Sequence, residues 1–456
     1  MNRNQFFAYF GIILGAVLIS LLAIRSDFSP KGLSLLIFSA VFLLTLIKPN
    51  IGLVIIIISM LFSPDISLAQ AASRVIFVRV DDVFLLVVVL AWVIRSAFTK
   101  NLSEAIKTPL FPLFSGYILL CLFSSLIAAI IGKINFTISI FSTLKYAQYF
   151  IIFLMVRENL KTLRQAKFFV IVFLFVAFIV SVQANMFIQE QLNAGSTFFR
   201  VSPPIESRGG SEANTMGGYL LFMLTVSLGL FLYMRGILPK ILLFILIFIM
   251  FRSFIYTLSR GSYLALIPAF LALAFISRKA NFIYFIIVLI FCGVFFVPDM
   301  VKTRLSQTLV AKESLVGRYM EIEESPKERL DSWKKVIFED FSKSPIIGHG
   351  VARRFIDGQV FTVLFEVGLL GLLFFVWILV RFSRILKKTF QDLLPTQDNF
   401  SLGLTAGFIA GFVGLIFHSL SGNTFIIIRV MEPFWFLGAI VVSLPHLLIA
   451  KTEQEI

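Results

Sequence analysis

Long apolar runs, separated by short polar breaks, follow one another along almost the whole 456-residue chain. A helix needs roughly 20 apolar residues to cross a bilayer core of about 30 Å, so these runs predict transmembrane helices. They predict fourteen spans, and because the third is short, twelve or thirteen full crossings stay open. The predicted spans are 6–24, 33–47, 51–63, 80–94, 109–131, 138–156, 167–187, 216–234, 239–256, 260–276, 281–297, 359–380, 401–420 and 424–449.

Composition supports the same interpretation. Hydrophobic residues make up 59% of the chain and charged residues 14%, whereas about a quarter of a typical soluble domain is charged. The mean hydropathy is +0.96. The two cysteines, Cys121 and Cys292, lie inside apolar runs, so we expect packing residues and not a disulfide framework. The expected fold class is an all-α integral membrane protein with about 12–14 transmembrane helices and one long outer loop.

The chain divides into four expected parts by position of the spans and of the polar stretches. The long loop contains a helix start at S-P-K-E, residues 325–328, where Ser325 would be the cap and Pro326 the first helical residue. The parts are 1–200 with N-terminal transmembrane helices, 201–297 with core transmembrane helices and arginine motifs, 298–358 as the long loop, and 359–456 with C-terminal transmembrane helices.

Apolar residues within the long loop are spaced as on amphipathic helices. A stripe of Leu330, Trp333, Val336, Ile337 and Phe341 predicts a helix on the outer face of the bundle, ended by the proline and glycines that follow. A weaker stripe upstream predicts a second such helix. Its residues are Leu305, Leu309, Val316 and Met320.

The distribution of lysine and arginine predicts the orientation of the chain. With a cytoplasmic N-terminus, the inner segments carry 18 of the 40 cations but only six of the 25 acids. Half of the remaining 22 cations lie in 298–358, and they are discounted because long loops cross the membrane largely regardless of charge. The positive-inside rule therefore predicts cytoplasmic termini and an external loop. Most of the net charge of +15 is a topology signal, so no nucleic-acid partner is expected.

Arginine dominates the charged residues that this topology places toward the outer face. A charge at membrane depth costs about 2.5–3.5 kcal/mol or more, so it usually faces a cavity or a partner. The planar guanidinium binds phosphate in a bidentate manner, which suggests a lipid-linked phosphate or pyrophosphate as ligand. For single arginines, snorkelling to head groups is the alternative, and Asp81 and Asp82 are more simply explained as helix caps. The set is Arg74, Arg79, Asp81, Asp82, Arg200, Glu206, Arg208, Glu212, Arg252, Arg260, Arg304, Arg318, Arg329, His418, Arg429 and Glu432, with residues 344–371.

Motifs for several other chemistries are missing from the sequence. It has no P-loop, no H-E-x-x-H, no G-x-S-x-G and no D-x-D of the kind that holds a metal against a sugar nucleotide. It has three histidines, so a histidine-rich metal site is not expected. We therefore expect no metal and no cofactor.

Four short motifs follow one another in the second half of the chain. Their order around one long outer loop resembles the O-antigen ligase and polymerase superfamily over residues 205–380. The motifs are Arg208 with Gly209, Asn214 and Gly218; T-L-S-R-G-x-x-L-A at 257–265; Arg329 and Trp333 before P-I-I-G-x-G at 345–350; and L-x-E-x-G-L-L-G-L-L at 364–373.

The resemblance implies a metal-independent membrane glycosyltransferase of O-antigen or exopolysaccharide biosynthesis. Members of the superfamily transfer a glycan from undecaprenyl pyrophosphate to an acceptor hydroxyl at the outer, periplasmic face of the bacterial inner membrane. The implied partners are this lipid-linked glycan, the bilayer and other membrane proteins of polysaccharide assembly. Arginines would neutralise the charge that develops on the leaving pyrophosphate. Those expected to bind it are Arg208, Arg260, Arg329, Arg353, Arg354 and Arg318.

Asp357 stands where ligase-like relatives carry a histidine, nine residues before the position of Glu366. Polymerase-like members often have an aspartate there, so the resemblance favours polymerisation of repeat units over ligation to a lipid or protein acceptor. Asp357 is thus expected to orient or deprotonate the acceptor hydroxyl, with capping of the helix near Gln359 as the alternative. His349, between two glycines, is the second candidate catalytic residue, weighed against a role in the loop itself.

Two further classes of protein stay open. A lipid-linked oligosaccharide flippase would also have many helices, but transporters often show repeated halves and charges near the midplane. This chain shows no similarity between its halves, and its charges gather at one face. The other class is a scaffold for polysaccharide assembly without enzyme activity.

Overall fold

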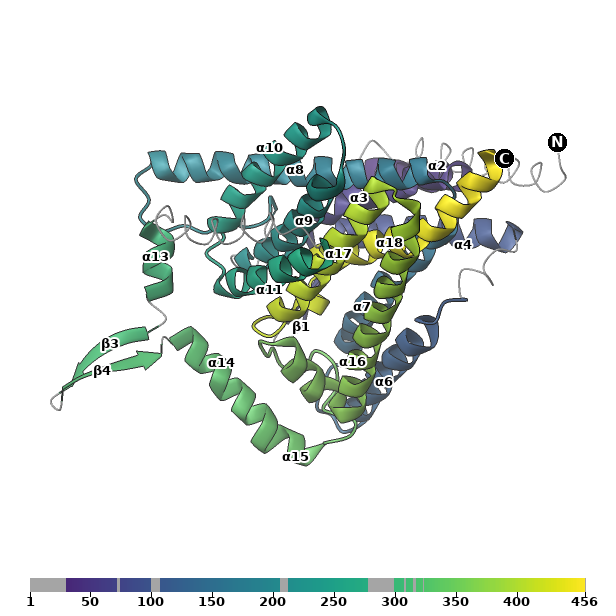
Figure 1. Cartoon of the computed structure of the whole chain (residues 1–456). Coiled ribbons are helices and arrows are strands. Elements are labelled where there is room, and N and C mark those ends of the chain that lie inside the picture. Colours follow the sequence, from purple (N-terminus) through teal and green to yellow (C-terminus); the bar gives the residue numbers. More distant parts are fainter. Residues whose placement is uncertain are drawn as a thin grey trace.

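The computed structural model describes residues 30–71, 74–99, 107–205, 212–277, 299–306, 309–314, 317–322 and 324–455. Nine helices in these ranges are long and apolar enough to cross a membrane, and each lies on a predicted span (Figure 1). The predicted spans 6–24 and 281–297 lie outside the described residues. The nine are α6 (Phe111–Ile130), α7 (Phe136–Asn159), α8 (Leu163–Asn193), α9 (Ala213–Tyr233), α10 (Ile237–Ile255), α11 (Arg260–Ser277), α16 (Gln359–Leu393), α17 (Asn399–His418) and α18 (Ile428–Glu455).

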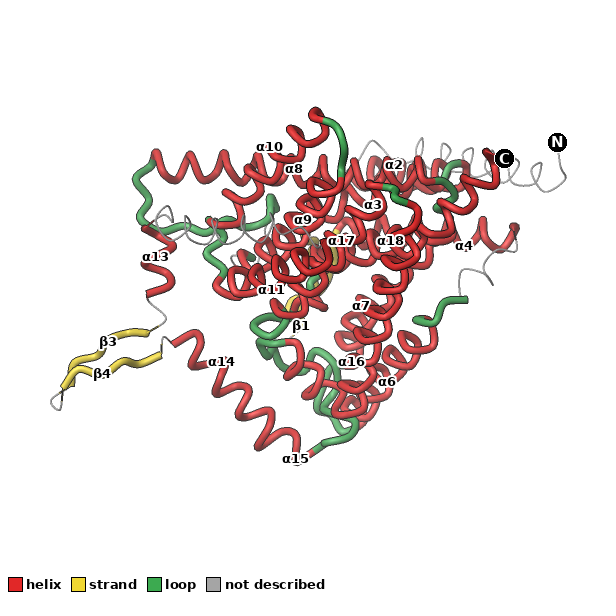
Figure 2. The backbone as a smooth tube through the Cα atoms, viewed as in Figure 1, coloured by secondary structure: helices red, strands yellow, loops and turns green. Residues whose placement is uncertain are grey.

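Figure 2 also shows the remaining helices and strands of the described residues. The helices α2 and α3 are apolar but short, and α4 carries two aspartates in its first turn. These elements are α2 (Pro30–Ile47), α3 (Pro49–Phe62), β1 (Asp65–Ala71), β2 (Arg74–Arg79), α4 (Val80–Thr99), α13 (Asp299–Ser306), β3 (Leu309–Ser314), β4 (Gly317–Ile322), α14 (Glu324–Lys335), the π-helical η1 (Val336–Asp340), α15 (Phe341–Lys343), and the 3₁₀ turns η2 (Leu394–Thr396) and η3 (Thr424–Ile426).

The long loop follows the prediction in its second half and departs from it in its first half. Helix α14 begins at Glu324, next to the predicted start, and continues through η1 and α15 to Lys343. Of the weaker stripe, Leu305 lies in helix α13, whereas Leu309 and Met320 lie in β3 and β4, which pair as an antiparallel hairpin that projects from the helices and not as the predicted helix (Figure 1). The local reason is that Gly317 begins β4, and glycine disfavours the interior of a helix.

Close packing of α9 against α17 forms the centre of the bundle. Both helices, with α18, are the most buried of the nine described spans. Glycines allow the two backbones to approach: a Cβ on Gly407 would lie 2.5 Å from the carbonyl oxygen of Thr225, and one on Gly229 would lie 2.4 Å from that of Gly403. Small residues serve this purpose in membrane helices, where lipid tails are as apolar as leucine and helices associate through close packing.

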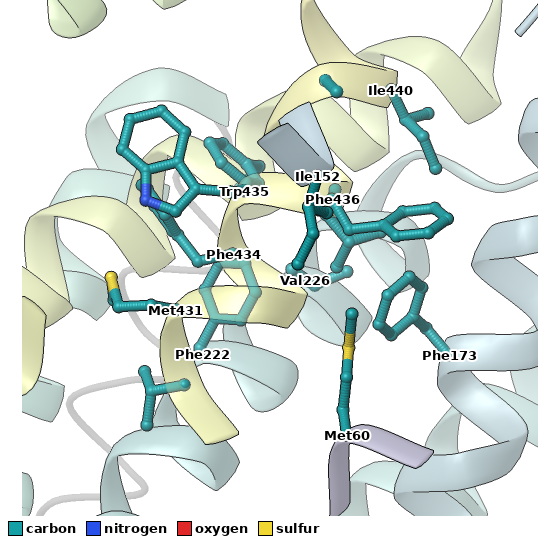
Figure 3. Packing of buried hydrophobic residues seen from close by; sticks show 14 of the residues in the cluster. Met60, Ile152, Phe173, Phe222, Val226, Met431, Phe434, Trp435, Phe436 and Ile440 are labelled. Carbon is teal, nitrogen blue, oxygen red and sulfur yellow. The ribbon is translucent and has the colours of Figure 1, made fainter. Parts of the chain in front are cut away.

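Aromatic side chains fill the space around α18. Phe434 packs between Phe222 of α9 and neighbouring rings, and Phe436 lies against Phe173 of α8 with ring centroids 5.1 Å apart (Figure 3). The same cluster takes in Met60 of α3, and its members extend from Val41 to Leu447. One continuous core therefore joins helices from both ends of the chain.

Helix α16 is broken at Gly368, which has φ 70° and ψ −165°. The loop before the helix fills the break: Leu369 donates its N–H to the carbonyl oxygen of Pro345 at 2.8 Å, and Gly350 donates to the carbonyl oxygen of Glu366 at 3.0 Å. These bonds satisfy backbone groups that a broken helix leaves exposed at membrane depth. The N-terminal part of α16 is thereby held by the loop that precedes it.

Candidate functional site

The chain between α17 and α18, residues 418–427, contains polar residues that are buried or partly buried, and we call it the polar hub. It leaves α17 at His418, forms the turn η3 and enters α18 at Ile428. His418, Ser419 and Thr424 are buried. Segments from four other regions of the chain hydrogen-bond to the hub or to the first turn of α18.

The first turn of α16 is fixed to the polar hub from both sides. The backbone N–H of Gln359 donates to the carbonyl oxygen of Ser419 at 2.9 Å. In return, Gln359 Oε1 accepts the N–H of Phe425 at 3.0 Å, and Asn423 Nδ2 donates to the carbonyl oxygen of Ile356 at 2.6 Å. Because these bonds involve buried groups, they determine where α16 starts.

Asp357, which precedes the cap residue of α16, connects this helix to α14 of the long loop. Arg329 Nε donates to Asp357 Oδ2 at 2.8 Å, and Trp333 Nε1 donates to the carbonyl oxygen of Asp357 at 2.6 Å. Trp333 also stacks on Phe361, with ring centroids 4.6 Å apart. The cap position of α16 is Gly358, with φ 93°, and Asp357 binds Arg329 instead of capping the helix. The structure therefore joins two predicted site residues, whose side chains are 26% and 29% exposed.

His349, predicted as a second candidate base, has a structural environment. Its side chain is buried, Nε2 lies 2.9 Å from the carbonyl oxygen of Asp340, and the ring packs on Phe365 at 5.0 Å. Arg354 pairs with the Asp340 carboxylate at 2.8 Å and places its guanidinium 4.6 Å above the same phenylalanine. These contacts hold His349 within the loop that precedes α16. Arg353, by contrast, is exposed.

The first turn of α11 binds another side of the polar hub. His418 Nε2 lies 3.0 Å from Ser262 Oγ, and Nδ1 lies 2.7 Å from Thr424 Oγ1. Ser262 Oγ is in turn 2.8 Å from Ser259 Oγ. Arg260, a predicted pyrophosphate ligand, is the first residue of α11, stands between these serines in sequence and is partly exposed.

The hydrogen bonds continue from α11 to the start of α9. Ser259 Oγ donates to Asn214 Oδ1 at 3.0 Å, and Arg200 Nη2 reaches the same oxygen at 3.4 Å. Arg200 Nε donates to the carbonyl oxygen of Thr257 at 3.2 Å. Ser259 is buried, whereas Asn214 is exposed and Arg200 partly so. The chain of polar groups thus runs from the core to the surface.

A cluster of charged and polar side chains from the N-terminal half of the chain contacts α18 near the polar hub. Arg79 Nη2 pairs with Asp81 at 3.0 Å, and Lys145 Nζ pairs with Asp82 at 2.6 Å. Asp82 also accepts the backbone N–H of Arg79 at 3.0 Å, as expected of a capping residue. The amide of Gln148 links Asp82, at 3.1 Å, to the carboxylate of α18, at 2.5 Å. The cluster comprises Arg79, Asp81, Asp82, Lys145, Gln148 and Glu432.

Arg429 in the first turn of α18 is the largest fully buried side chain among the described residues. Its guanidinium binds the Glu212 carboxylate and the carbonyl oxygen of Ile205. These contacts tie α18 to the two ends of the segment that contains Arg208, which itself lies outside the described residues. Arg318 has its backbone in β4, but its side chain is not among those described.

Two surface cavities lie away from the polar hub. One of about 640 Å³ is formed by α11, α16 and α17 and is lined by Ser277, Lys387 and Leu394 at the far ends of these helices. The other, of about 670 Å³, is apolar and lies between α6, α7 and α16, beside Phe123 and Phe374. Neither cavity is lined by a predicted site residue that the structure describes.

No group of three or more histidine, cysteine, aspartate or glutamate residues in the described ranges is placed to hold a metal ion. No protein-family model matches the chain, and no curated protein matches it. The arrangement around the polar hub is therefore the structural basis for a functional proposal.

Sequence reasoning from charged residues missed the uncharged part of this site. Ser262, Asn423 and Thr424 carry no charge and lie at the ends of predicted spans, so hydropathy alone assigns them to span boundaries. The available signal was the density of small polar residues in T-L-S-R-G-S at 257–262 and S-L-S-G-N-T at 419–424. Such residues hydrogen-bond across helices when a membrane protein buries them.

Proposed function

We propose that the chain polymerises glycan repeat units carried on undecaprenyl pyrophosphate at the outer face of the bacterial inner membrane. The observation that carries the proposal is a convergence: the motif segments around Asn214, Ser259, Arg329 and Glu366 are far apart in sequence. The Ser259 segment reaches the polar hub through Ser262 and His418. Helix α16, which carries Glu366, reaches the hub through Gln359, and Arg329 joins this side through its pair with Asp357. A single site for a single reaction explains this arrangement.

The arginines bind the pyrophosphate of the donor. Arg329 and Arg260 stand at the two sides of the polar hub, and each is partly exposed, so a ligand can reach them. The bond from Arg329 to Asp357 uses one of the five N–H donors of the guanidinium, which leaves a fork for phosphate oxygens. As the glycosyl bond breaks, negative charge grows on the pyrophosphate, and fixed guanidinium groups stabilise it.

Asp357 receives the acceptor sugar. The acceptor oxygen bonds to the anomeric carbon, the bond from that carbon to the pyrophosphate oxygen breaks, and the hydroxyl proton passes to the Asp357 carboxylate. A carboxylate is a weak base, so proton transfer occurs late, when the hydroxyl has become acidic. Arg329 keeps the carboxylate in place, and its orientation matters more than its basicity.

Reconstitution into proteoliposomes with an undecaprenyl-pyrophosphate-linked repeat unit tests the proposal. We expect a ladder of products on a gel from the unmodified protein. Arg260→Lys and Arg329→Lys keep the charge but lose the fork, and a charge-assisted contact contributes about 1.5–3 kcal/mol, so both variants should shorten the ladder severely. Arg384→Lys, an exposed arginine on the other half of α16, is the matched control and should be normal.

The same assay separates the rival functions. A single transfer to an added lipid or protein acceptor without a ladder would indicate a ligase. Movement of the intact lipid-linked glycan between leaflets, without any new glycosidic bond, would indicate a flippase. Near-normal ladders in both lysine variants would contradict the assignment of these arginines.

The outer location of the loop has its own test. Glu328 on α14 and Thr396 in η2 are both exposed. Glu328 precedes α16 in the chain and Thr396 follows it, so the two residues are separated by this predicted membrane span. In a variant with Cys121 and Cys292 replaced by alanine, Glu328→Cys should react with an impermeant thiol reagent from outside the cell, and Thr396→Cys only after permeabilisation. Labelling of both positions from one side contradicts the proposed topology.

A further inference from the structure

The hydrogen bonds between His418 and Asn214 have a direction that their chemistry dictates. The guanidinium of Arg200 can only donate, so the Asn214 atom that faces it must be the carbonyl oxygen Oδ1, as found. That oxygen can only accept, so the Ser259 hydroxyl donates its single proton to it. The next two bonds then have one solution each.

Ser259 Oγ has no proton left and must accept from the Ser262 hydroxyl at 2.8 Å. Ser262 in turn must accept from His418, which therefore carries its proton on Nε2. With Nε2 protonated, Nδ1 of the neutral ring accepts from the Thr424 hydroxyl at 2.7 Å. A doubly protonated ring is disfavoured because His418 is 1% exposed and would bury a charge.

We propose that His418 is a positioning residue of the glycosyl-transfer site, in its Nε2–H form, and that it acts through Ser262, Ser259 and Asn214 on Arg200. The inference rests on the proposed function for its catalytic consequence, but its structural content stands separately. Ser259 also accepts the N–H of Ser262 at 3.4 Å, as a helix cap does, so the same chain fixes the first turn of α11, where Arg260 stands.

The direction of the bonds excludes two other roles for the Ser–His pair. In a hydrolytic pair the serine hydroxyl donates to the imidazole, which removes its proton, but here the imidazole donates to Ser262. A proton relay toward the surface is excluded as well. The series of hydrogen bonds ends on the amide oxygen of Asn214, which does not take up a proton at ordinary pH. What the chain can do is hold Arg200 and the start of α11 in one arrangement.

The histidine tautomer can be observed directly. In proteoliposomes with ¹⁵N-labelled histidine, solid-state spectra should show His418 neutral with its proton on Nε2, assigned by the signal lost in His418→Gln. Ser259→Ala, which does not touch the imidazole, frees the Ser262 hydroxyl to donate to Nε2 and should shift His418 toward the Nδ1–H form. An Nδ1–H ring in the unmodified protein, or an unchanged tautomer in Ser259→Ala, overturns the proposal.

The kinetic consequence is specific to the lipid-linked donor. Ser259→Ala and Asn214→Leu should raise the KM for the donor about tenfold, equivalent to about 1.4 kcal/mol, with kcat changed less. His418→Gln keeps a donor toward Ser262 and should retain more donor affinity than His418→Phe. Ser443→Ala, which removes a buried hydroxyl bonded only to its own helix at Ala439, is the matched control. A uniform loss of kcat in all variants contradicts a positioning role.

The two assays fail separately. If no donor supports a ladder in the unmodified protein, the proposed function fails. The tautomer of His418 still decides the direction of the hydrogen bonds from His418 to Asn214. If the ladder forms but the tautomer is wrong, the function stands and this inference fails.

Discussion

Two arginine–aspartate pairs of nearly equal length hold different parts of this protein. Arg79 and Asp81 are 3.0 Å apart, and Arg329 and Asp357 are 2.8 Å apart. The side chains of the first pair are 8% and 2% exposed, whereas those of the second are 26% and 29% exposed. The chemistry is the same, and burial is the difference.

Burial decides what each pair can do. The first pair is enclosed beside a second ion pair, a glutamine and the carboxylate of Glu432, and Arg79 also donates to the carbonyl oxygen of Met60 at 2.8 Å. Separating it leaves charges with no water to solvate them. The second pair lies at a seam between α14 and α16, where both side chains are partly exposed to water. The first pair therefore stabilises the fold, whereas water can solvate the charges of the second pair when its partners separate.

The largest expected effect on stability comes from Arg79→Met. The variant leaves Asp81 buried without its guanidinium, and breaking a buried pair in this way costs about 3–5 kcal/mol. Unfolding in mixed detergent micelles should show this loss directly. Arg384→Met on the exposed face of α16 is the matched control and should change the free energy of unfolding by less than about 0.5 kcal/mol. Equal stability of the two variants contradicts the distinction by burial.

Gly368→Ala should have the next largest effect, because it acts on the connection that carries the second pair. The residue has φ 70°, and an added Cβ would lie 2.4 Å from the carbonyl oxygen of Ile346. Strained backbone of this kind costs roughly 1–3 kcal/mol, and the loop before α16 must shift. We expect lower stability together with a shortened ladder. Gly195→Ala is a control for positive φ without crowding, since no atom lies within 4 Å of the added Cβ.

The sequence predicted the framework of this fold because span length and hydropathy are local properties. Each described helix long enough to cross a membrane lies on a predicted run, and helix α14 follows its apolar stripe. The break at Gly368 was not predicted, although the glycine belonged to a recognised motif. Its cause is tertiary: the loop around Gly348 supplies the hydrogen bonds that make the break tolerable, and no local pattern contains that information.

The candidate site was predicted only in its charged members. The sequence predicts separate roles for Arg329 and Asp357, and their pairing depends on how α14 meets α16. The position of His349 between glycines indicates a candidate base, but its burial against Phe365 follows from packing and not from spacing. His418 was one of many outer charges, and its partners are serines and a threonine, which a search for charge passes over.

Arg329→Met tests the partly exposed pair, Arg329–Asp357. Loss of a partly exposed pair costs about 0–1 kcal/mol, so unfolding should be nearly unchanged. Under the proposed function, activity should nevertheless fall strongly, because the variant removes both the proposed contact to the donor pyrophosphate and the group that holds Asp357. Asp357→Asn, which keeps the hydrogen bond to Arg329 and loses the charge, should separate orientation from proton transfer. A full ladder from Asp357→Asn assigns orientation alone to this residue.

The smallest effect is expected from Lys334→Met, on the same helix as Arg329. Lys334 lies 3.8 Å from Asp331, and these side chains are 70% and 62% exposed, so the pair is screened by water and contributes little. We expect unfolding within about 0.5 kcal/mol of the unmodified protein and a normal ladder. The variant removes the same charge from α14 as Arg329→Met does, so it distinguishes a specific contact from the general positive field of the helix. If both variants shorten the ladder equally, the field of α14 attracts the donor and the Arg329–Asp357 pair has no special role; if only Arg329→Met does, the position of the guanidinium at the seam is what matters.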